Sequence, residues 1–331
     1  MSVRIINGDC LSVLKTLPDA SVQCCVTSPP YWGLRDYGVA GQLGLESTPA
    51  EYVAGMVAVF AEVRRVLRDD GTLWLNLGDS YAADRGGTYM PAETLAGGVS
   101  GQGDDSTMRG RGEKEDGNAR RNCKRYGLKH KDLVGIPWRV AFALQADGWY
   151  LRQDIIWAKP NPMPESVTDR CTKAHEYLFL LAKSARYYFD AAAIAEPAKY
   201  SGITGMDGSG FKPPQDFNGK HSGGSETLPP RKTVEGNDSG TRNKRSVWTV
   251  NTKPFAEAHF ATFPPALIEP CILAGCPAGG VVLDPFGGAG TTGLVSDRHG
   301  RDAILIELNP EYAAMANNRI FNDAPLFADV A

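Results

Sequence analysis

Several features that would define a protein class are scarce in this sequence of 331 residues or missing from it. No apolar run approaches the roughly 18 residues that cross a membrane, and the N-terminus lacks the apolar core of a signal peptide. Seven cysteines include no Cys-x-x-Cys pair, and the five histidines do not stand beside them at metal-ligand spacing. We therefore expect a globular, cytoplasmic protein with no membrane segment, no metal site and no disulfide framework, whose cysteines are reduced and mostly buried.

Net charge is small as well. The whole chain carries −3, so its composition alone does not indicate a nucleic-acid-binding protein. The charge is unevenly distributed, however, because residues 109–131 contain nine Lys or Arg and only three Asp or Glu. Such a local excess of positive charge can contact phosphates, and a solvated run of charge is the alternative interpretation.

What the sequence does contain is a regular alternation of strand-like and helix-like segments. Residues 22–27 form a short run of β-formers without Gly or Pro, which is typical of a buried parallel strand. Residues 49–71 predict a helix that has Pro49 near its start and is closed by Gly71. The alternation continues to the C-terminal part of the chain and predicts an α/β fold with a mostly parallel sheet.

Two polar stretches interrupt this alternation. Residues 81–130 and 191–246 are rich in Gly, Ser and charged residues, and they show no hydrophobic periodicity. A stretch as long as the first, inside a compact domain, is typical of a mobile loop and not of a hidden helix or strand. We expect both stretches to be insertions in the α/β fold.

A glycine-rich segment near the C-terminus has the form of a ligand-binding turn. The strand predicted at residues 281–283 brings Asp284 to its carboxyl end, which is where open α/β sheets bind ligands. Residues 286–290 then form a tight turn whose backbone can approach a ligand closely. Thr291 opens a helix whose free N–H groups suit an anion. Glu307 ends the next strand, in a position that suits the two hydroxyls of a ribose.

The same segment satisfies the pattern Gly-x-Gly-x-x-Gly at Gly288, Gly290 and Gly293, which by itself would suggest NAD. Only 38 residues follow Gly293, however, and a dinucleotide-binding fold would need its second half and a substrate domain after that point. Either the bound nucleotide is smaller, or the order of the sheet is permuted.

A second motif follows the strand predicted at residues 22–27. Ser28-Pro29-Pro30-Tyr31 is a variant of the Asp/Asn/Ser-Pro-Pro-Tyr motif, and with it the chain resembles the DNA amino-methyltransferases in which the catalytic motif precedes the cofactor loop. Further stretches that resemble this family cover most of the chain outside the two insertions: residues 7–19, 71–81, 157–184, 245–252, 259–270 and 283–294. The resemblance implies a permuted Rossmann-like methyltransferase fold, with helices on both faces of a mostly parallel twisted sheet.

The family's chemistry accounts for the residues of this motif. The resemblance implies that a methyl group passes from S-adenosylmethionine to the exocyclic amine of a base flipped out of double-stranded DNA. The lone pair of that amine is delocalised into the ring, so the amine is a poor nucleophile. Hydrogen bonds to Ser28 Oγ and the Pro29 carbonyl would favour a tetrahedral nitrogen that attacks the methyl group in line. Pro29 and Pro30 would hold the carbonyl outward, and Tyr31 would stack on the base.

The resemblance also implies a set of cofactor-binding residues. Asp9 would lie near the adenine of the cofactor, and Phe263 and Pro264 would line its methionine pocket. The main cofactor site is implied at Asp284, Phe286, Gly288, Gly290, Thr291, Thr292 and Glu307. His259 belongs to one of the resembling stretches, and a packed or capping histidine is the alternative to a ligand-binding one.

Two stretches bear on the identity of the target base. Residues 27–33 and 161–167 both resemble the methylases of the cytosine amine (N4), whereas Asp-Pro-Pro-Tyr is typical of those of the adenine amine (N6). A serine hydroxyl and a carboxylate can both bind an amine, so adenine remains the alternative. Methylation of a ring carbon would need a nucleophilic cysteine beyond the cofactor loop. Cys271 precedes that loop inside an apolar helix, where we expect it to pack in the core.

The implied organisation has five parts. Residues 1–80 and 131–190 form the half with the catalytic motif, 81–130 a mobile basic loop, 191–250 a target-recognition insertion and 251–331 the S-adenosylmethionine-binding half. We expect DNA contacts from the basic loop and from residues after the catalytic motif: Trp32, Arg35, Arg109, Arg111, Arg120, Arg121, Lys124 and Arg125. Trp32, Arg35 and Tyr37 could support the flipped base or fill the gap that it leaves, and packing is the alternative for Trp32.

Other functions remain open at this point. They are methylation of RNA or of a protein amide, a catalytically inactive DNA-binding module, and an NAD-dependent oxidoreductase. The basic loop and the cytosine-type motifs argue against the amide, and the intact catalytic and cofactor motifs argue against the inactive module. The family resemblance is compatible with a monomer or a homodimer, with a bacterial or phage origin, and with a paired restriction nuclease.

Overall fold

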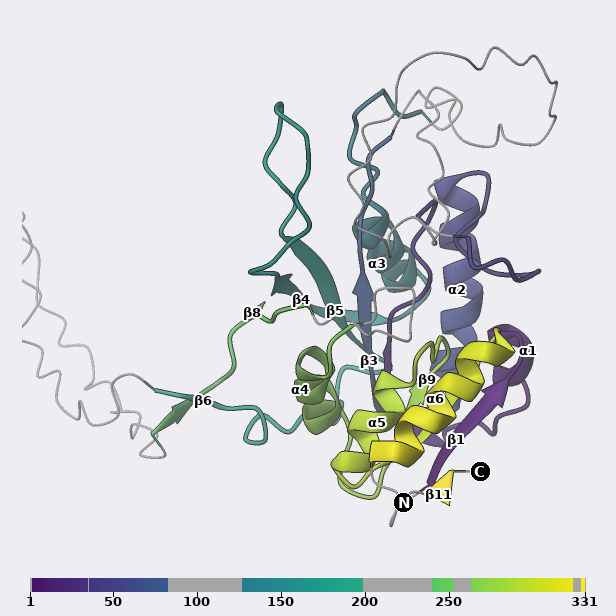
Figure 1. Cartoon of the computed structure of the whole chain (residues 1–331). Helices are drawn as coiled ribbons and strands as arrows, with labels where there is room; N and C mark the ends of the chain where they lie inside the picture. Colours follow the sequence, from purple (N-terminus) through teal and green to yellow (C-terminus); the bar gives the residue numbers. More distant parts are fainter. Residues whose placement is uncertain are drawn as a thin grey trace, which may run out of the picture. The chain divides into compact units, whose positions relative to one another are not determined.

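The computed structural model describes residues 2–34, 36–82, 127–198, 240–252 and 263–323, and the backbone of 329–330 (Figure 1). The chain forms two compact units. One unit comprises Met1–Asp190 and Arg245–Ala331, and the other comprises Ala191–Lys244. Within the second unit, β6 (Glu196–Pro197) pairs antiparallel with β7 (Thr241–Arg242).

The first unit is built on a nine-stranded sheet with the order β11-β1-β10-β9-β2-β3-β5-β4-β8. In that order the strands span Asp329–Val330, Ser2–Asn7, Asp302–Glu307, Val281–Asp284, Val22–Thr27, Leu67–Leu77, His175–Ala182, Tyr150–Ala158 and Val247–Thr249. β5 runs antiparallel to both of its neighbours, and the other pairings are parallel. The prediction of an α/β fold with a mostly parallel sheet is therefore confirmed.

Helices cover both faces of this sheet (Figure 1). The alternation of side chains along β10 shows the two faces, because Ile306 packs in one core cluster and its neighbour Leu305 in another. The cluster around Ile306 contains buried residues of α1 (Cys10–Leu14), α2 (Pro49–Val66) and α3 (Ile136–Ala146). The cluster around Leu305 contains residues of α5 (Thr291–Arg298) and α6 (Pro310–Asp323), and α4 (Pro265–Gly275) packs beside α5.

The start of α2 follows the prediction, but its end does not. Thr48 and Glu51 form a reciprocal capping box, with Pro49 in the first turn. The expectation that Gly71 closes the helix was wrong, because α2 ends at Val66 and β3 begins at the next residue. Gly71 lies inside β3, where a Cβ atom would come within 2.9 Å of the Arg68 carbonyl oxygen. The glycine therefore permits a close approach of backbone in the sheet.

The helix α6 was not predicted from the sequence. Its signals are present, since Ala313, Ala316 and Ile320 recur at helical spacing and are buried. The Asn309 side chain accepts a hydrogen bond from the Glu311 N–H at 2.9 Å, which supports the first turn. Small and polar residues dominate the rest of the segment, so its apolar stripe is narrow and easy to overlook.

The described cysteines agree with the expectation of reduced, mostly buried thiols. Cys171 is exposed, none of the described cysteines forms a disulfide, and the buried ones are Cys10, Cys24, Cys25, Cys271 and Cys276. Cys271 is completely buried in α4 and contacts the Leu267 carbonyl, as expected for a packing residue. Within the described part of the chain, no helix has the length and apolar character that a membrane crossing requires.

Candidate active site

The carboxyl ends of five neighbouring strands meet at one cavity of about 850 Å³. Residues directly after β1, β2, β3, β9 and β10 line it, which is the location that the parallel arrangement predicts for a ligand site. One side of the cavity is formed by Asp9, Phe263, Phe286, Gly288, Thr291 and Glu307. The other side is formed by Ser28, Pro29, Pro30, Tyr31, Asn76, Lys159 and Glu176. The two motifs recognised in the sequence therefore face the same space.

Asp284 holds this edge of the sheet together from behind the cavity wall. Its buried carboxylate accepts hydrogen bonds of 2.6 Å from the hydroxyls of both Thr27 and Thr292, and one of 3.1 Å from the Phe286 N–H. Burial raises the pKa of Asp284, and these hydrogen bonds oppose that effect by stabilising the charged form. Asp284 thus joins β2, β9 and α5, and its described oxygen contacts are all internal.

Glu307, in contrast, faces the cavity. One carboxylate oxygen accepts the Gly288 N–H at 2.7 Å, and the other accepts the Asn309 N–H at 2.8 Å. Burial raises the pKa of Glu307, although these backbone hydrogen bonds work in the opposite direction. A carboxylate has about four acceptor positions, so two remain to receive hydroxyl groups of a ligand.

Contacts with α6 hold the shape of the glycine-rich turn at residues 286–290. Gly290 has φ +75° and caps α5, and a Cβ atom on it would lie 2.8 Å from the Ala316 Cβ in α6. The Arg319 guanidinium, also on α6, donates to the Ala289 carbonyl and to Thr291 Oγ1, both at 2.9 Å. Because α6 was missed in the sequence, the contribution of Arg319 to the turn was missed with it.

We expect Gly290→Ala to lower the free energy of unfolding by about 2–4 kcal/mol, since it combines left-handed backbone strain with a steric overlap. Gly279→Ala is the matched control, because Gly279 has φ +72° but no atom within 4 Å of the added methyl group. In Gly279→Ala only the backbone strain is expected to lower the free energy of unfolding, by about 1–2 kcal/mol. Urea unfolding of both variants measures the difference, and equal losses would contradict the packing role of Gly290.

Some of the residues implied for the cofactor site do not line the cavity. The ones that lie behind its wall are Pro264, Asp284, Gly290 and Thr292. Asp9 lines the cavity but also caps α1, because its carboxylate accepts hydrogen bonds from the Ser12 N–H and hydroxyl. The expected cofactor set thus separates into residues that can touch a ligand and residues that shape the turn.

The turn at residues 28–31 is hydrogen-bonded to α2 at one position and open to the cavity at another. The Tyr52 hydroxyl donates to the Pro30 carbonyl at 2.9 Å, so this carbonyl is already bound. The Ser28 hydroxyl is half-buried and has a single long contact among the described residues, 3.4 Å to the Tyr31 hydroxyl. Ser28 Oγ is therefore free to bind a group that enters the cavity.

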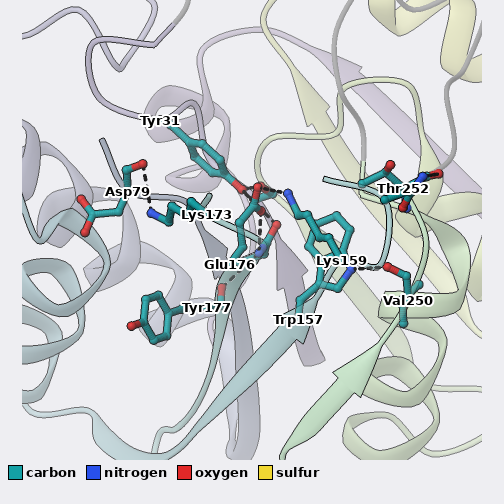
Figure 2. A network of polar contacts seen from close by, with 12 residues as sticks. Tyr31, Asp79, Trp157, Lys159, Lys173, Glu176, Tyr177, Val250 and Thr252 are labelled. Carbon is teal, nitrogen blue, oxygen red and sulfur yellow. Dashed lines mark hydrogen bonds and ion pairs between the residues drawn. The ribbon is translucent and has the colours of Figure 1, made fainter. Parts of the chain in front are cut away.

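Tyr31 is held by a polar network that the sequence did not reveal (Figure 2). Its hydroxyl lies 2.8 Å from the Glu176 carboxylate and 3.1 Å from the Asn76 amide oxygen. Glu176 also forms an ion pair with Lys159, whose ammonium group lies 4.2 Å from the centre of the Trp157 ring. Burial and the Glu176 carboxylate both raise the pKa of Tyr31, so the phenol stays protonated and donates.

The members of this network come from strands that are far apart in sequence. Asn76 lies on β3, Glu176 on β5 and Lys159 directly after β4, and the antiparallel pairings of β5 bring them together. Gly78 completes the arrangement, because a Cβ atom on it would come within 2.5 Å of the Tyr31 ring. Polar residues inside otherwise apolar strands were the only available signal, and this signal does not say which residues are partners.

Lys173 adds a second positive charge to this side of the cavity. Its ammonium group donates to the Asp79 carbonyl at 3.1 Å, and burial lowers its pKa (Figure 2). The Asp79 carboxylate in turn accepts the Gly135 and Ile136 N–H groups at the start of α3. Lys159 and Lys173 therefore bring two ammonium groups to a part of the cavity that Asp79, Glu165 and Glu176 also line.

Most residues expected to contact DNA lie outside the described part of the chain. They are Arg35, Arg109, Arg111, Arg120, Arg121, Lys124 and Arg125, and His259 lies outside it too. Trp32 is described, and its indole N–H donates to the Glu46 carbonyl at 2.9 Å while its ring packs against the core. This supports the packing alternative for Trp32. Tyr37 lines the cavity.

The chain is similar in sequence to known DNA methyltransferases. A family model described as "DNA methylase" matches residues 22–318. Type II methyltransferases M.XycI of Xanthomonas campestris pv. cyanopsidis and M.Cfr9I of Citrobacter freundii are 47% and 46% identical over 96% of this chain and 87% of their own length. M.SmaI of Serratia marcescens is 44% identical over 96% of this chain and 91% of its length.

Two solved structures share the fold. PvuII DNA methyltransferase, described as cytosine-N4-specific, has a TM-score of 0.59 at 18% identity over 98% of this chain and 93% of its own. A protein from Thermus thermophilus that is described as a putative DNA modification methylase, complexed with S-adenosylmethionine, has a TM-score of 0.56 at 22% identity over 99% of both chains. These similarities confirm the fold class expected from the sequence.

Proposed function

Since this chain belongs to the N6/N4 DNA methylase family, we propose that it transfers the methyl group of S-adenosylmethionine to the N4 amine of a cytosine in double-stranded DNA. The observation that carries the proposal is that Ser28, directly after β2, and Glu307, at the end of β10, line one cavity across the intervening strand β9. A cofactor bound at Glu307 and a base bound at Ser28 would share that space. The transferred methyl group would then lie between them.

The residues on the Glu307 side suit S-adenosylmethionine. Glu307 has acceptor positions left for two ribose hydroxyls, and Gly288 has open space where a side chain would otherwise stand. Phe263 and Phe286 offer apolar surface. When bound, the cofactor supplies a methyl group activated by the positive charge on its sulfur. The protein's task is to place an amine in line with that group.

On the other side, Ser28 and the turn that carries it would prepare the amine. Ser28 Oγ would accept a hydrogen bond from one N–H of the target amine, and the Pro29 carbonyl would accept the other. Two acceptors on the same amine draw its lone pair out of conjugation with the ring, toward the methyl group. The Tyr31 ring, held by Glu176, Asn76 and Gly78, would stack on the base.

Cofactor binding should depend on pH through Glu307. Burial raises the pKa of Glu307 above the usual value near 4.5, and the protonated acid loses acceptor capacity for the ribose. Affinity for S-adenosylmethionine is therefore expected to fall as the pH falls through this raised pKa, at a higher pH than an exposed glutamate would give. Calorimetric titration at several pH values measures this. Glu307→Gln should bind more weakly at neutral pH and lose the acid dependence, whereas an unchanged acid dependence in that variant would assign the titration to another group.

The target base is tested by nucleoside mass spectrometry. Purified protein, unmethylated duplex DNA and S-adenosylmethionine are incubated, and the DNA is digested to nucleosides. N4-methylcytosine is the expected product. N6-methyladenine as the product would be consistent with the proposed mechanism but would overturn cytosine as the target base. If the protein binds the cofactor and no methylated nucleoside forms, RNA and protein substrates would be tested next.

The surrounding biology follows from the same proposal. The three relatives are type II methyltransferases, so we propose site-specific methylation in a restriction-modification context. The insertion at 191–250 and the basic loop at 81–130 would contact the DNA around the target. The protein would act in the cytoplasm as a monomer or a homodimer.

A further inference from the structure

A methionine stands out at the mouth of the cavity. Met163 has 77% of its surface exposed, the highest value among the large exposed hydrophobic residues of the described chain. It lies in the connection between β4 and β5, residues 159–174, which extends beyond the ends of these strands (Figure 1), and it contributes to the lining of the cavity. An apolar side chain at such a place is fully hydrated unless another molecule covers it.

The local sequence restricts the backbone around this side chain. Pro162 and Pro164 flank Met163, and each proline fixes its own φ while it also restricts the residue before it to extended conformations. The Pro-Met-Pro segment therefore has a stiff backbone, and its methionine side chain is exposed in the structure. Methionine itself is unbranched and polarisable, so it adapts to an irregular apolar surface.

The connection is also anchored at both sides of Met163. Asn161 exchanges two hydrogen bonds with the Thr252 backbone, at 3.3 and 3.1 Å. On the other side, the Glu165 carboxylate accepts hydrogen bonds from Arg170 and from the Lys173 N–H. Met163 therefore lies in a part of the connection that hydrogen bonds support on both sides.

Base flipping creates a demand for a side chain of this kind. When a nucleotide leaves the duplex, the neighbouring bases lose a stacking partner, and apolar side chains that enter such steps offset part of the loss. Trp32, one of the residues expected to fill the gap, is bound to Glu46 and packed against the core. Met163 has the exposure, the rigid support and the position at the cavity mouth that this role requires.

We propose that Met163 enters the base stack of the DNA and occupies the space left by the flipped target nucleotide. The proposal rests on the proposed function, since it needs DNA as substrate. It assigns to Met163 a contact with the unflipped neighbours of the target, separate from the chemistry at Ser28. Its effect should therefore depend on whether the target base is stacked and paired before binding.

The recognition site is first located by sequencing DNA that the wild-type protein has methylated. The test then compares two substrates that carry this site. One is a fully paired duplex, and in the other the target nucleotide faces an abasic position, which weakens its pairing. Met163→Ala should lower kcat/KM on the paired duplex roughly tenfold or more and on the second substrate about twofold or less. Met163→Leu should restore most of the activity. Val167→Ala is the matched control, because Val167 is an exposed apolar residue of the same connection that does not line the cavity.

The activity of Met163→Ala on the two substrates supports or overturns the proposal. Full activity of Met163→Ala on the paired duplex would overturn the proposal. Equal losses on both substrates would also overturn it, because they would mean that Met163 shapes the cavity and does not enter the stack. If sequencing finds no site that the wild-type protein methylates, the proposed function itself fails before Met163 is tested. A fluorescent cytosine analogue at the target gives a second readout, in which the variant should show less unstacking on the paired duplex.

Discussion

Replacing Ser28 by alanine is expected to lower turnover on DNA by about 100-fold or more, because one positioned acceptor for the target amine is lost. The serine hydroxyl has only a 3.4 Å contact with Tyr31 among the described residues, so its removal breaks no strong internal bond. Affinity for S-adenosylmethionine and the unfolding temperature should therefore stay near those of the wild type. Single-turnover methylation and cofactor titration measure the two effects separately.

A second substitution keeps this test specific. Tyr31→Phe removes the partner of the Ser28 hydroxyl but leaves Ser28 in place, so its turnover should fall less than that of Ser28→Ala. Unchanged turnover in Ser28→Ala would refute the role assigned to Ser28. A parallel loss of cofactor affinity would mean instead that the turn had collapsed.

Replacing Glu176 by alanine is expected to lower turnover roughly 10- to 100-fold, although we propose no contact between Glu176 and the amine. Glu176 receives the Tyr31 hydroxyl at 2.8 Å and pairs with Lys159, and the side chains of Glu176 and Lys159 are only 16% and 17% exposed. Its loss would leave a largely buried ammonium group without its ion-pair partner, and it would leave the Tyr31 hydroxyl with the longer contact to Asn76. The ring that is to stack on the base would then be free to shift.

Three measurements separate this positioning role from general destabilisation. Cofactor affinity should change little, since Glu176 lies on the Ser28 side of the cavity. Glu176→Ala and Tyr31→Phe should be non-additive in turnover, because both remove the same hydrogen bond. Asp323→Asn, which breaks the Arg298–Asp323 ion pair between α5 and α6, serves as the control and should leave turnover unchanged. Additive losses in the double variant would count against the network.

The residues that line the cavity were easier to predict from the sequence than the residues that support them. Ser28 and Glu307 were predicted because each directly follows or ends a strand within a short motif, and the carboxyl ends of parallel strands meet at one edge. Asp284 was predicted as part of the same motif, but the structure directs its carboxylate to Thr27 and Thr292, behind the cavity wall. A motif identifies the residue, and only the packing around it shows which way the side chain turns.

The sequence by itself determined the alternation of strands and helices, the two motifs and their permuted order, because these depend on local spacing and on residue chemistry. Only the tertiary structure decided that Glu176, Lys159 and Asn76 surround Tyr31, and that Met163 stands at the mouth of the same cavity. These residues lie on β3, on β5 and in the connection that follows β4. Strand pairing over long sequence separations brings them together, and no local pattern records which strands will pair.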